Sequence, residues 1–252
     1  TYLNSFYELR PLPYAEAGFG YPESGQTIVN VTNGKIIRLL VDDEPFDVRY
    51  GQLLEHERVL DLRAGVLRRQ VEWASPAGTH VRIRSTRLVS FAQRTVAAIL
   101  YEVEPVDAPL RVVAQSELVA NEPAPPQSAD PRAAAALEAP LQSEEFSHHG
   151  ARVLLVHTTK RSGLRMAAGM EHVIEGPAGT QIASESAADV GRVTVAANLG
   201  IGQHLSLVKF VSYGWSSQRS LPAVRDLVVA ALAEARHTGW DGLLAAQREY
   251  LD

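Results

Sequence analysis

The sequence contains no cysteine, only two methionines and no long apolar run. Without cysteine the chain can form no disulfide, no thiolate metal site and no thiol nucleophile. No apolar segment approaches the roughly 18 residues of a membrane-spanning helix, so we expect no membrane partner. A secretory signal is absent and the chain starts at Thr1 without an initiator Met, as expected of a trimmed chain. We therefore expect a cytoplasmic location.

An excess of positive charge is also missing. The formal net charge of −5 argues against nucleic acid as a partner, because phosphate binding needs a cationic surface. Hydrophobic residues make up 46% and charged residues 21%, which is ordinary for a soluble globular protein. At 252 residues the chain can form one large β domain or two smaller ones, with a substantial core.

The pattern that is present is mainly that of antiparallel strands. Apolar and polar residues alternate through residues 57–103 on both sides of a Pro-Ala-Gly turn, which predicts consecutive strands with one buried face. Val81 and Ile83 would point to that face. Leu88 breaks the alternation, so we predict a β-bulge or a strong twist near residues 85–86.

The other face of the same strand carries a row of basic residues, His80, Arg82 and Arg84. Such a row could bind a polyanion. The favoured interpretation is the solvated face of an antiparallel sheet, since one face of such sheets commonly meets water.

The N-terminal region gives weaker signals. Residues 1–25 are rich in aromatic residues, glycine and proline and are predicted to be a loop-rich lead-in. Residues 28–31 look like a strand, and Asn33-Gly34 is the strongest two-residue hairpin signal in the chain. We therefore predict a returning strand at residues 35–41.

Short strands separated by turns continue through most of the chain. They are predicted at residues 94–104, 110–118, 152–157, 163–168, 171–175, 192–197 and 204–213. Many short strands with turns between them indicate a sandwich rather than a βαβ fold. Residues 1–218 are accordingly interpreted as one mainly β domain, a large antiparallel β-sandwich.

A long excursion interrupts this sandwich. Residues 121–150 contain five prolines before Leu141 and are predicted to be a loop. Loops beyond about 12–15 residues inside a compact domain tend to be functional or disordered. Asn121, Asp130 and Arg132 are the side chains best suited to polar contacts there, Arg132 through its planar donor fork. A mobile surface insertion is the open alternative.

The C-terminal region changes to a helical pattern. Apolar residues within residues 222–236 recur at helical spacing, and Thr238-Gly-Trp-Asp241 resembles the start of a second helix. That pattern is unfinished at Asp252, which suggests that the natural protein continues. We interpret residues 219–252 as a helical linker and expect its apolar faces to cover the sandwich poorly or to make contacts between chains.

Few residues form a recognisable chemical site. His148-His149 with Glu144-Glu145 could be metal ligands or an acid/base pair, but neighbouring residues of an extended segment point to opposite faces. Glu55-His56-Glu57 lacks the spacing of a helical zinc site and is predicted to be a polar loop. Trp73 and Trp215 could stack on sugars, although a core position is favoured. We predict no metal site and no catalytic residue, while a glycosidase-like carboxylate pair stays open because spacing does not reveal it.

Several segments together resemble the N-terminal domain of glycoside hydrolase family 65. These are Gly-Gln-Thr-Ile-Val-Asn-Val-Thr-Asn-Gly-Lys-Ile-Ile-Arg-Leu from residue 25, Leu-Asp-Leu-Arg-Ala-Gly-Val-Leu from residue 60, Val-Arg-Ile-Arg-Ser-Thr-Arg-Leu-Val-Ser from residue 81, and both ends, residues 1–8 and 240–251. The resemblance implies a super-sandwich similar to galactose mutarotase, then linker helices and an (α/α)6 barrel that carries the catalytic residues. No catalytic residue can therefore be carried over to this chain.

The resemblance also implies a function. The family includes maltose, trehalose and kojibiose phosphorylases and related hydrolases, with phosphate as co-substrate of the phosphorylases and no other cofactor. This chain would be their non-catalytic module, packing on its own barrel, supporting a homodimer and shaping the rim of a site for an α-linked disaccharide. Asn121, Asp130 and Arg132 would lie at that rim. The alternatives are a free-standing carbohydrate-binding module and, less favoured, a mutarotase-like sugar epimerase.

Overall fold

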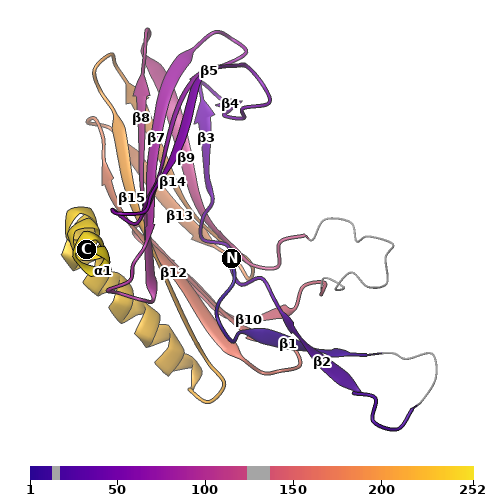
Figure 1. Cartoon of the computed structure of the whole chain (residues 1–252). Helices are drawn as coiled ribbons and strands as arrows, with labels where there is room; N and C mark the ends of the chain where they lie inside the picture. Colours follow the sequence, from indigo (N-terminus) through magenta and orange to yellow (C-terminus); the bar gives the residue numbers. More distant parts are fainter. Residues whose placement is uncertain (13–17, 124–136) are drawn as a thin grey trace.

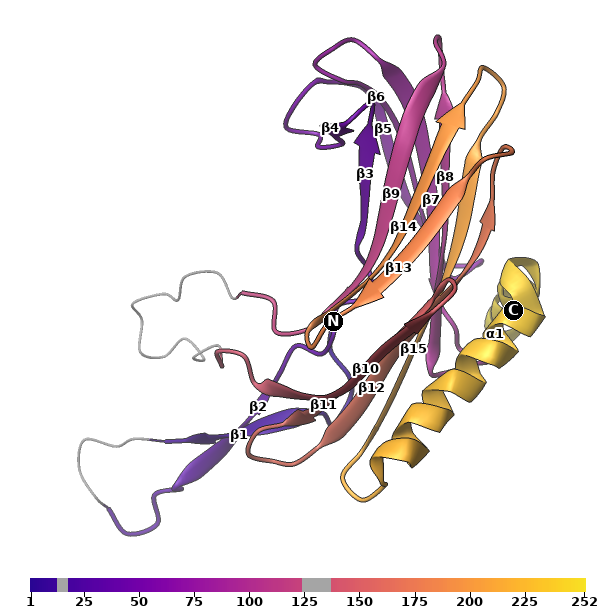
Figure 2. The ribbon, with the colours of Figure 1, turned by 180° about the vertical axis from the view of Figure 1, so that it is seen from behind.

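The fold is an antiparallel β-sandwich with one bent helix on its outside. The computed structural model describes residues 1–12, 18–123 and 137–252. Figures 1 and 2 show three layers, with helix α1 (Leu221–Leu251), an eight-stranded sheet and a five-stranded sheet following one another. The prediction of a mainly β sandwich is confirmed.

The strands pair as follows. The larger sheet has the order β10 (Leu141–His149), β11 (Arg152–Thr159), β12 (Arg165–Glu175), β15 (Leu205–Ser216), β8 (Val96–Pro105), β7 (His80–Val89), β6 (Val66–Ala74) and β5 (Gln52–Asp61). The smaller sheet has the order β13 (Gln181–Ser186), β14 (Val190–Leu199), β9 (Leu110–Val119), β3 (Ile37–Val41) and β4 (Glu44–Pro45). A separate hairpin joins β1 (Tyr7–Pro11) and β2 (Ser24–Ile28).

The main core lies between the two sheets. Alternate residues of strands such as β6, β7, β9 and β14 face inward, and Trp73 is among the largest side chains that are fully buried there. Its ring meets Phe46 edge to face with centroids 5.4 Å apart, and its indole N–H donates to the carbonyl of Tyr50 at 2.7 Å. Trp73 therefore has the favoured core role and offers no face to a sugar.

A second core lies between α1 and the outer face of the eight-stranded sheet. Val228 and Leu232 of α1 are completely buried in it, with Phe210 and Leu154 of the sheet. Gly169 of β12 permits this close packing, because a Cβ there would lie 2.8 Å from side-chain carbons of both Val228 and Leu232. The expectation that the helical segment would cover the sandwich poorly is wrong.

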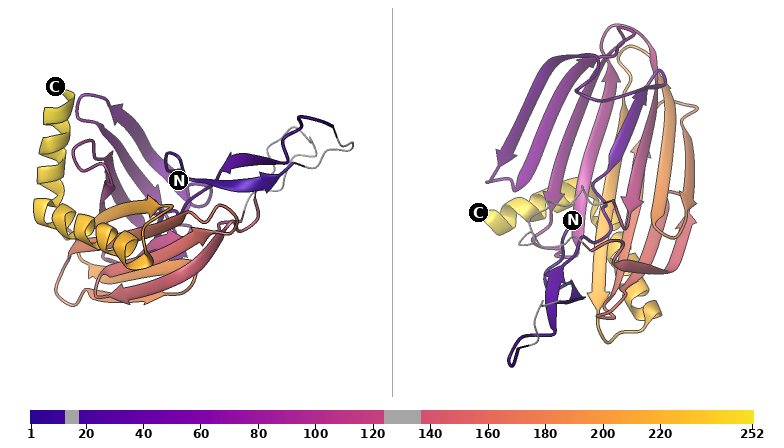
Figure 3. Two further views of the ribbon diagram at one scale, coloured as in Figure 1. Left: turned by 90° about the horizontal axis from the view of Figure 1, so that it is seen from below. Right: turned by 90° about the vertical axis from the view of Figure 1, so that its right-hand side faces the viewer.

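Helix α1 is bent where the sequence predicted a second helix to begin. Gly239 has the dihedral angles φ 71° and ψ 174°, which interrupt the helix, and Figure 3 (left) shows the two segments at an angle. The second segment is held by Gln247, which is 1% exposed. Its side chain accepts from the amide of Phe91 at 3.0 Å and donates to the carbonyls of Gly65 and Val89 at 3.2 and 3.1 Å.

Strand β7 contains no bulge. Its register with β6 runs without a shift from Ala74–His80 to Val66–Leu88. Leu88 breaks the alternation because it faces α1 in the second core, whereas Val81 faces the first core. The change of pattern thus marks where the helix begins to cover the outer face.

The basic row of β7 lies on the solvated outer face, as favoured from the sequence. Arg82 pairs with Glu72 at 2.9 Å and with Glu104 at 2.7 Å, and Arg84 pairs with Glu104 at 3.0 Å. Each arginine is therefore neutralised within the domain.

The Asn33-Gly34 hairpin is not formed. The strand before it ends at Ile28 and pairs with β1, while Asn33 makes a bridge to Val119 of β9. Gly34 instead permits a close approach, because a Cβ would lie 2.7 Å from both the hydroxyl of Tyr213 and Val211 Cγ1. Tertiary contacts override the local turn preference here.

The lead-in and the excursion also differ from prediction. The lead-in contains β1, whose Glu8 carboxylate accepts from the amides of Arg161 and Ser162 at 2.9 and 2.7 Å. The predicted loop at 121–150 is wrong at its C-terminal end, because residues 141–149 form β10. Residues 55–57, predicted to be a polar loop, lie within β5.

Candidate functional site

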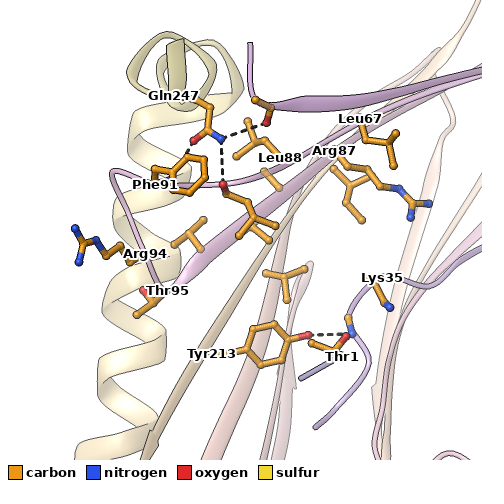
Figure 4. Close-up of a pocket in the computed structure, with 18 of the residues that line it drawn as sticks. Thr1, Lys35, Leu67, Arg87, Leu88, Phe91, Arg94, Thr95, Tyr213 and Gln247 are labelled. Carbon is orange, nitrogen blue, oxygen red and sulfur yellow. Dashed lines mark hydrogen bonds between the residues drawn. The ribbon is translucent and has the colours of Figure 1, made fainter. Parts of the chain in front are cut away.

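An open groove of about 950 Å³ lies at one end of the eight-stranded sheet (Figure 4). It is lined by residues of the N-terminal segment, the β5–β6 and β7–β8 connections, β15 and the C-terminal half of α1. Its side chains are mostly apolar, including Leu60, Leu62, Leu67, Val89, Phe91, Ile99, Val211, Trp215 and Leu251.

The groove exists because the smaller sheet covers only part of the larger one. Strand β5 is the free edge of the larger sheet, and its residues 52–60 are exposed on both faces. Figure 3 (right) shows this edge standing clear of the smaller sheet. Leu62 beyond its end is 75% exposed, and Leu60 is 64% exposed. Natural proteins usually cover or charge such an edge, since it can pair with another strand.

The walls of the groove are fixed by satisfied polar groups. On the helix side, the Gln247 amide binds the ends of β6 and β7, and Phe91 stacks on Tyr250 with ring centroids 5.2 Å apart. On the other side, the hydroxyl of Tyr213 accepts from the Gly34 amide at 3.0 Å and donates to the Thr32 carbonyl at 2.9 Å. Burial raises the pKa of Tyr213 to about 12, so this hydroxyl stays protonated as a donor.

Three arginines, here called the arginine cluster, lie on the inner face of the open sheet end. Arg58 of β5 is directly opposite Arg69 of β6, while Arg87 of β7 is opposite Leu67 on the same face. Arg69 bonds His56 Nε2 at 3.2 Å and lies 5.8 Å from the Phe46 ring centroid.

No carboxylate among the described residues pairs with this cluster. Figure 4 shows the side chains of Arg87 and Lys35 on the side of the groove away from α1. Burial lowers the pKa of Arg69 and of Arg87, and the nearby charge of Arg58 lowers both further. The cluster is therefore a concentration of positive charge in which Arg69 and Arg87 are half-buried and Arg58 is exposed.

A separate polar seam lies inside the sandwich, away from the groove. Lys209 is completely buried, and its ammonium group donates to the carbonyls of Ile36 and Glu117 at 3.2 and 2.9 Å. Burial lowers the pKa of Lys209 to about 7. Its cross-strand neighbour His172 has its pKa lowered to about 3, first by burial and then by the charge of Lys209. Because of this lowered pKa the His172 ring is neutral. Its Nδ1 donates to the Ala151 carbonyl at 2.8 Å, and its Nε2 accepts from the Ser116 hydroxyl at 2.8 Å.

Of the predicted site residues, Asn121 lies in the described part of the chain and does not line the groove. Asn121 closes the base of the excursion: its side chain accepts from the Leu141 amide at 3.1 Å and donates to the Leu141 carbonyl at 2.9 Å. It also donates to Asp189, which in turn contacts buried His157 at 3.0 Å. Asp130 and Arg132 lie outside the described residues.

Two members of the ionisable cluster on β10, Glu144 and His148, are bonded within the domain. Glu144 pairs with Arg165 at 2.8 Å, and His148 bonds Ser186 at 2.9 Å. Among residues 1–12, 18–123 and 137–252, no three His, Cys, Asp or Glu side chains are grouped as metal ligands. In the same part of the chain, no helix is both long and apolar enough to span a membrane.

Sequence reasoning missed the groove and the arginine cluster. The cluster could have been found from the hairpin register, because a turn at residues 62–65 places Arg58 opposite Arg69. The groove could not, since it depends on how far one sheet extends beyond the other.

Comparisons with known proteins cover the full length of the chain. The family description that matches residues 1–252 is "Glycosyl hydrolase family 65, N-terminal domain". An uncharacterised glycosyl hydrolase of Mycobacterium tuberculosis is 60% identical over 252 residues, covering 100% of this chain and 32% of the relative. An α,α-trehalose phosphorylase of Thermoanaerobacter brockii is 30% identical over 253 residues, covering 100% of this chain and 33% of the relative.

A solved structure agrees with the fold. It is assigned as a kojibiose phosphorylase from the human microbiome and has a TM-score of 0.85 at 17% identity, covering 99% of this chain and 31% of that one. This chain thus spans about a third of the length of the proteins that it resembles.

Proposed function

Since the chain belongs to the N-terminal domain family of glycosyl hydrolase family 65, we propose that it is the non-catalytic module of a disaccharide phosphorylase or hydrolase. The supporting observation is that the family matches all 252 residues, while the chain spans only 32% of the M. tuberculosis relative. We place the catalytic (α/α)6 barrel in the remaining length of a longer parent protein. The module would pack on that barrel, support a homodimer and shape the rim of the active site.

The reaction proposed for the parent is phosphorolysis or hydrolysis of an α-linked disaccharide. A general acid in the barrel would protonate the leaving oxygen, while phosphate or an activated water attacks the sugar from the opposite face. Inorganic phosphate would be the co-substrate in the first case, and no other cofactor is proposed. A cytoplasmic location of the parent stays a prediction.

Activity assays of two proteins test this proposal. The full-length parent and the 252-residue chain would each be incubated with trehalose, kojibiose and maltose, with and without phosphate. We expect the parent to release glucose 1-phosphate only with phosphate, or glucose without it, and the shorter chain to release neither. Product released by the 252-residue chain alone would overturn the non-catalytic assignment.

The rim residues need a separate test. Replacing Asp130 and Arg132 by Ala in the parent should raise KM for the disaccharide or lower kcat while leaving the fold intact. Asn121 belongs to the same proposal, although its amide is already bonded to Leu141 and Asp189. Kinetics unchanged within about twofold, equivalent to less than roughly 0.5 kcal/mol, would favour a surface insertion instead.

The alternatives have less support. A free-standing carbohydrate-binding module would use Trp73, Trp215 and the N-terminal tyrosines. Trp73 is completely buried, and the Trp215 ring packs against Phe6 at 6.1 Å. Trp215 and the exposed Tyr2 line the groove. A mutarotase-like epimerase would need a histidine and a carboxylate in a sheet cleft. The pair formed by His157 and Asp189 lies at the base of the excursion and does not line the groove.

A further inference from the structure

The open groove carries two features that the domain itself leaves uncovered. The first is apolar: Leu60, Leu62 and Val89 are 64%, 75% and 69% exposed and lie together at the groove. Contiguous exposed apolar side chains on a soluble domain mark a site of contact with another surface. The adjoining edge of β5 is ten residues long and has no neighbour among the described strands.

The second feature is the charge of the arginine cluster. Arg68, Arg82 and Arg84 extend from the outer face of the same strands, and each is paired with a carboxylate at 2.7–3.0 Å. On the inner face, no described carboxylate pairs with Arg58, Arg69 or Arg87. Apart from one another, their cross-strand partners on that face are Leu67, Ser85 and Ile99, none of which is acidic. Arginine beside exposed apolar side chains is typical of the core of a protein interface.

We infer that the groove and the arginine cluster form one docking surface for a segment of the parent polypeptide beyond this module. That segment would place large apolar side chains between Leu60, Leu62 and Val89 and would set carboxylates against the arginines. The inference rests on the proposed function. It adds which face of the module contacts the rest of the parent protein. An arginine can bind such a carboxylate through two parallel hydrogen bonds.

Two observations favour this occupant. The relatives are about three times as long as the chain, so most of a parent of that size lies outside the module. Leu251, in the last turn of α1, itself lines the groove, so polypeptide that follows the helix would begin at its rim.

A second copy of the chain fits the surface less well. If β5 paired with the β5 strand of a second copy under two-fold symmetry, one residue would have to lie directly opposite the same residue of the copy. The reason is that hydrogen-bonded and non-hydrogen-bonded residue pairs alternate along an antiparallel ladder, and the symmetry axis cannot exchange one kind for the other. Centring on His56 would oppose Glu55 to Glu57 of the copy, and centring on Glu57 would oppose that residue to itself. Like charges directly opposite each other are destabilising. A copy would also bring a second arginine cluster toward the first.

Photo-crosslinking in the full-length parent tests the occupant. A benzophenone amino acid would replace Leu62 in the groove and, in comparison proteins, the exposed residues Phe146, Ile182 or Ile201 on other faces. We expect the Leu62 probe alone to give intramolecular crosslinks to peptides beyond residue 252. Crosslinks from Leu62 to a second copy, or none at all, would overturn the inference.

The comparison probes separate this inference from the proposed function. Downstream crosslinks from Phe146, Ile182 or Ile201 but not from Leu62 would show that the module packs on the barrel through another face. Absence of downstream crosslinks from all four positions would contradict the packing role itself.

Charge reversal tests the arginine cluster independently. In the parent, Arg58→Glu with Arg87→Glu should accelerate hydrogen exchange of the exposed β5 edge at least 10-fold, whereas Arg219→Glu, at an exposed site away from the groove, should not. Exchange that stays unchanged in the double variant would contradict a role for the arginines. If protection of β5 instead requires added inorganic phosphate, the cluster binds a small anion rather than a carboxylate segment, which also overturns the inference.

Discussion

The eight-stranded sheet has a covered half and an open end, and the two regions differ in how their charged side chains are paired. In the covered half, β12 and β15 lie between the smaller sheet and α1, and their charged groups find partners. Glu171, 4% exposed, binds Arg152 at 3.1 Å and Arg236 of α1 at 2.8 Å. At the open end, the inner faces of β5, β6 and β7 hold the arginine cluster without a described carboxylate. The open end therefore leaves charged groups without a described carboxylate partner, whereas the covered half is a complete core.

The largest expected effect comes from removing the outer cover of the open end. Deleting residues 239–252 takes away buried Leu243 and the three hydrogen bonds of Gln247. Losing one buried leucine costs about 2–5 kcal/mol and each hydrogen bond about 1 kcal/mol, so we expect a loss of about 5–8 kcal/mol. For a chain of this size the melting temperature should fall by roughly 10–30 °C.

Thermal unfolding of the truncated and complete chains measures this loss. The matched variant Gln247→Ala removes only the hydrogen bonds and should lower the melting temperature by a smaller amount. A fall below about 5 °C on truncation, corresponding to roughly 1–2 kcal/mol, would support the linker interpretation of residues 239–252.

The second expectation concerns pH and the buried lysine of the covered half. The pKa of Lys209 is about 7 in the folded chain and 10.5 ordinarily, so between these values the unfolded chain binds more protons. Stability should therefore rise as the pH increases from 7 to 10.5, and the penalty for charging Lys209 is fully present below pH 7. Each tenfold difference in proton affinity is equivalent to about 1.4 kcal/mol, so the free energy of unfolding should rise by roughly 5 kcal/mol over this interval.

Urea denaturation at several pH values would show this slope. Lys209→Met should remove most of it, whereas Lys160→Met, at an exposed lysine, should keep it. An equal slope in both variants would mean that Lys209 is not the group responsible.

Much of this fold was readable from the sequence, because antiparallel hairpins have local patterns. The alternation of Val81, Arg82 and Ile83 predicted both the strand and its solvated face. Leu88 also carried a readable signal, namely an apolar residue on the second face, which indicates a second core rather than a bulge.

What could not be predicted depends on relations between distant segments. Asn33-Gly34 has a strong local turn preference, yet contacts with Val119 and Tyr213, far along the chain, decide its conformation. The groove depends on the unequal extent of two sheets, and the arginine cluster on the register of three strands. Local patterns therefore point to the polar residues of a long loop as the candidate site, whereas the open surface lies at the sheet end.

The third expectation compares two leucines, one from each region. Leu232→Ala should cost about 3 kcal/mol, since this side chain is completely buried against Gly169, where a cavity would remain. Leu62→Ala should change stability by less than about 0.5 kcal/mol, because Leu62 is 75% exposed in the module. Urea denaturation of both variants measures the difference. Equal losses would mean that the open end is as well packed as the covered half.

The smallest expected effect lies at Asn121, where the covered half meets the excursion. Its amide group bonds the backbone of Leu141 in both directions, and its φ of 50° is a conformation that Asn tolerates better than Ala. Asn121→Ala should therefore cost about 1–2 kcal/mol, from lost hydrogen bonds and backbone strain together. Asn121→Gly removes the bonds but relieves the strain, so its loss should be smaller. Exposed Asn198→Ala is the control and should stay within about 0.5 kcal/mol. If Asn121→Ala leaves stability unchanged but raises the KM of the parent, Asn121 belongs to the active-site rim and not to the clamp at the base of the excursion.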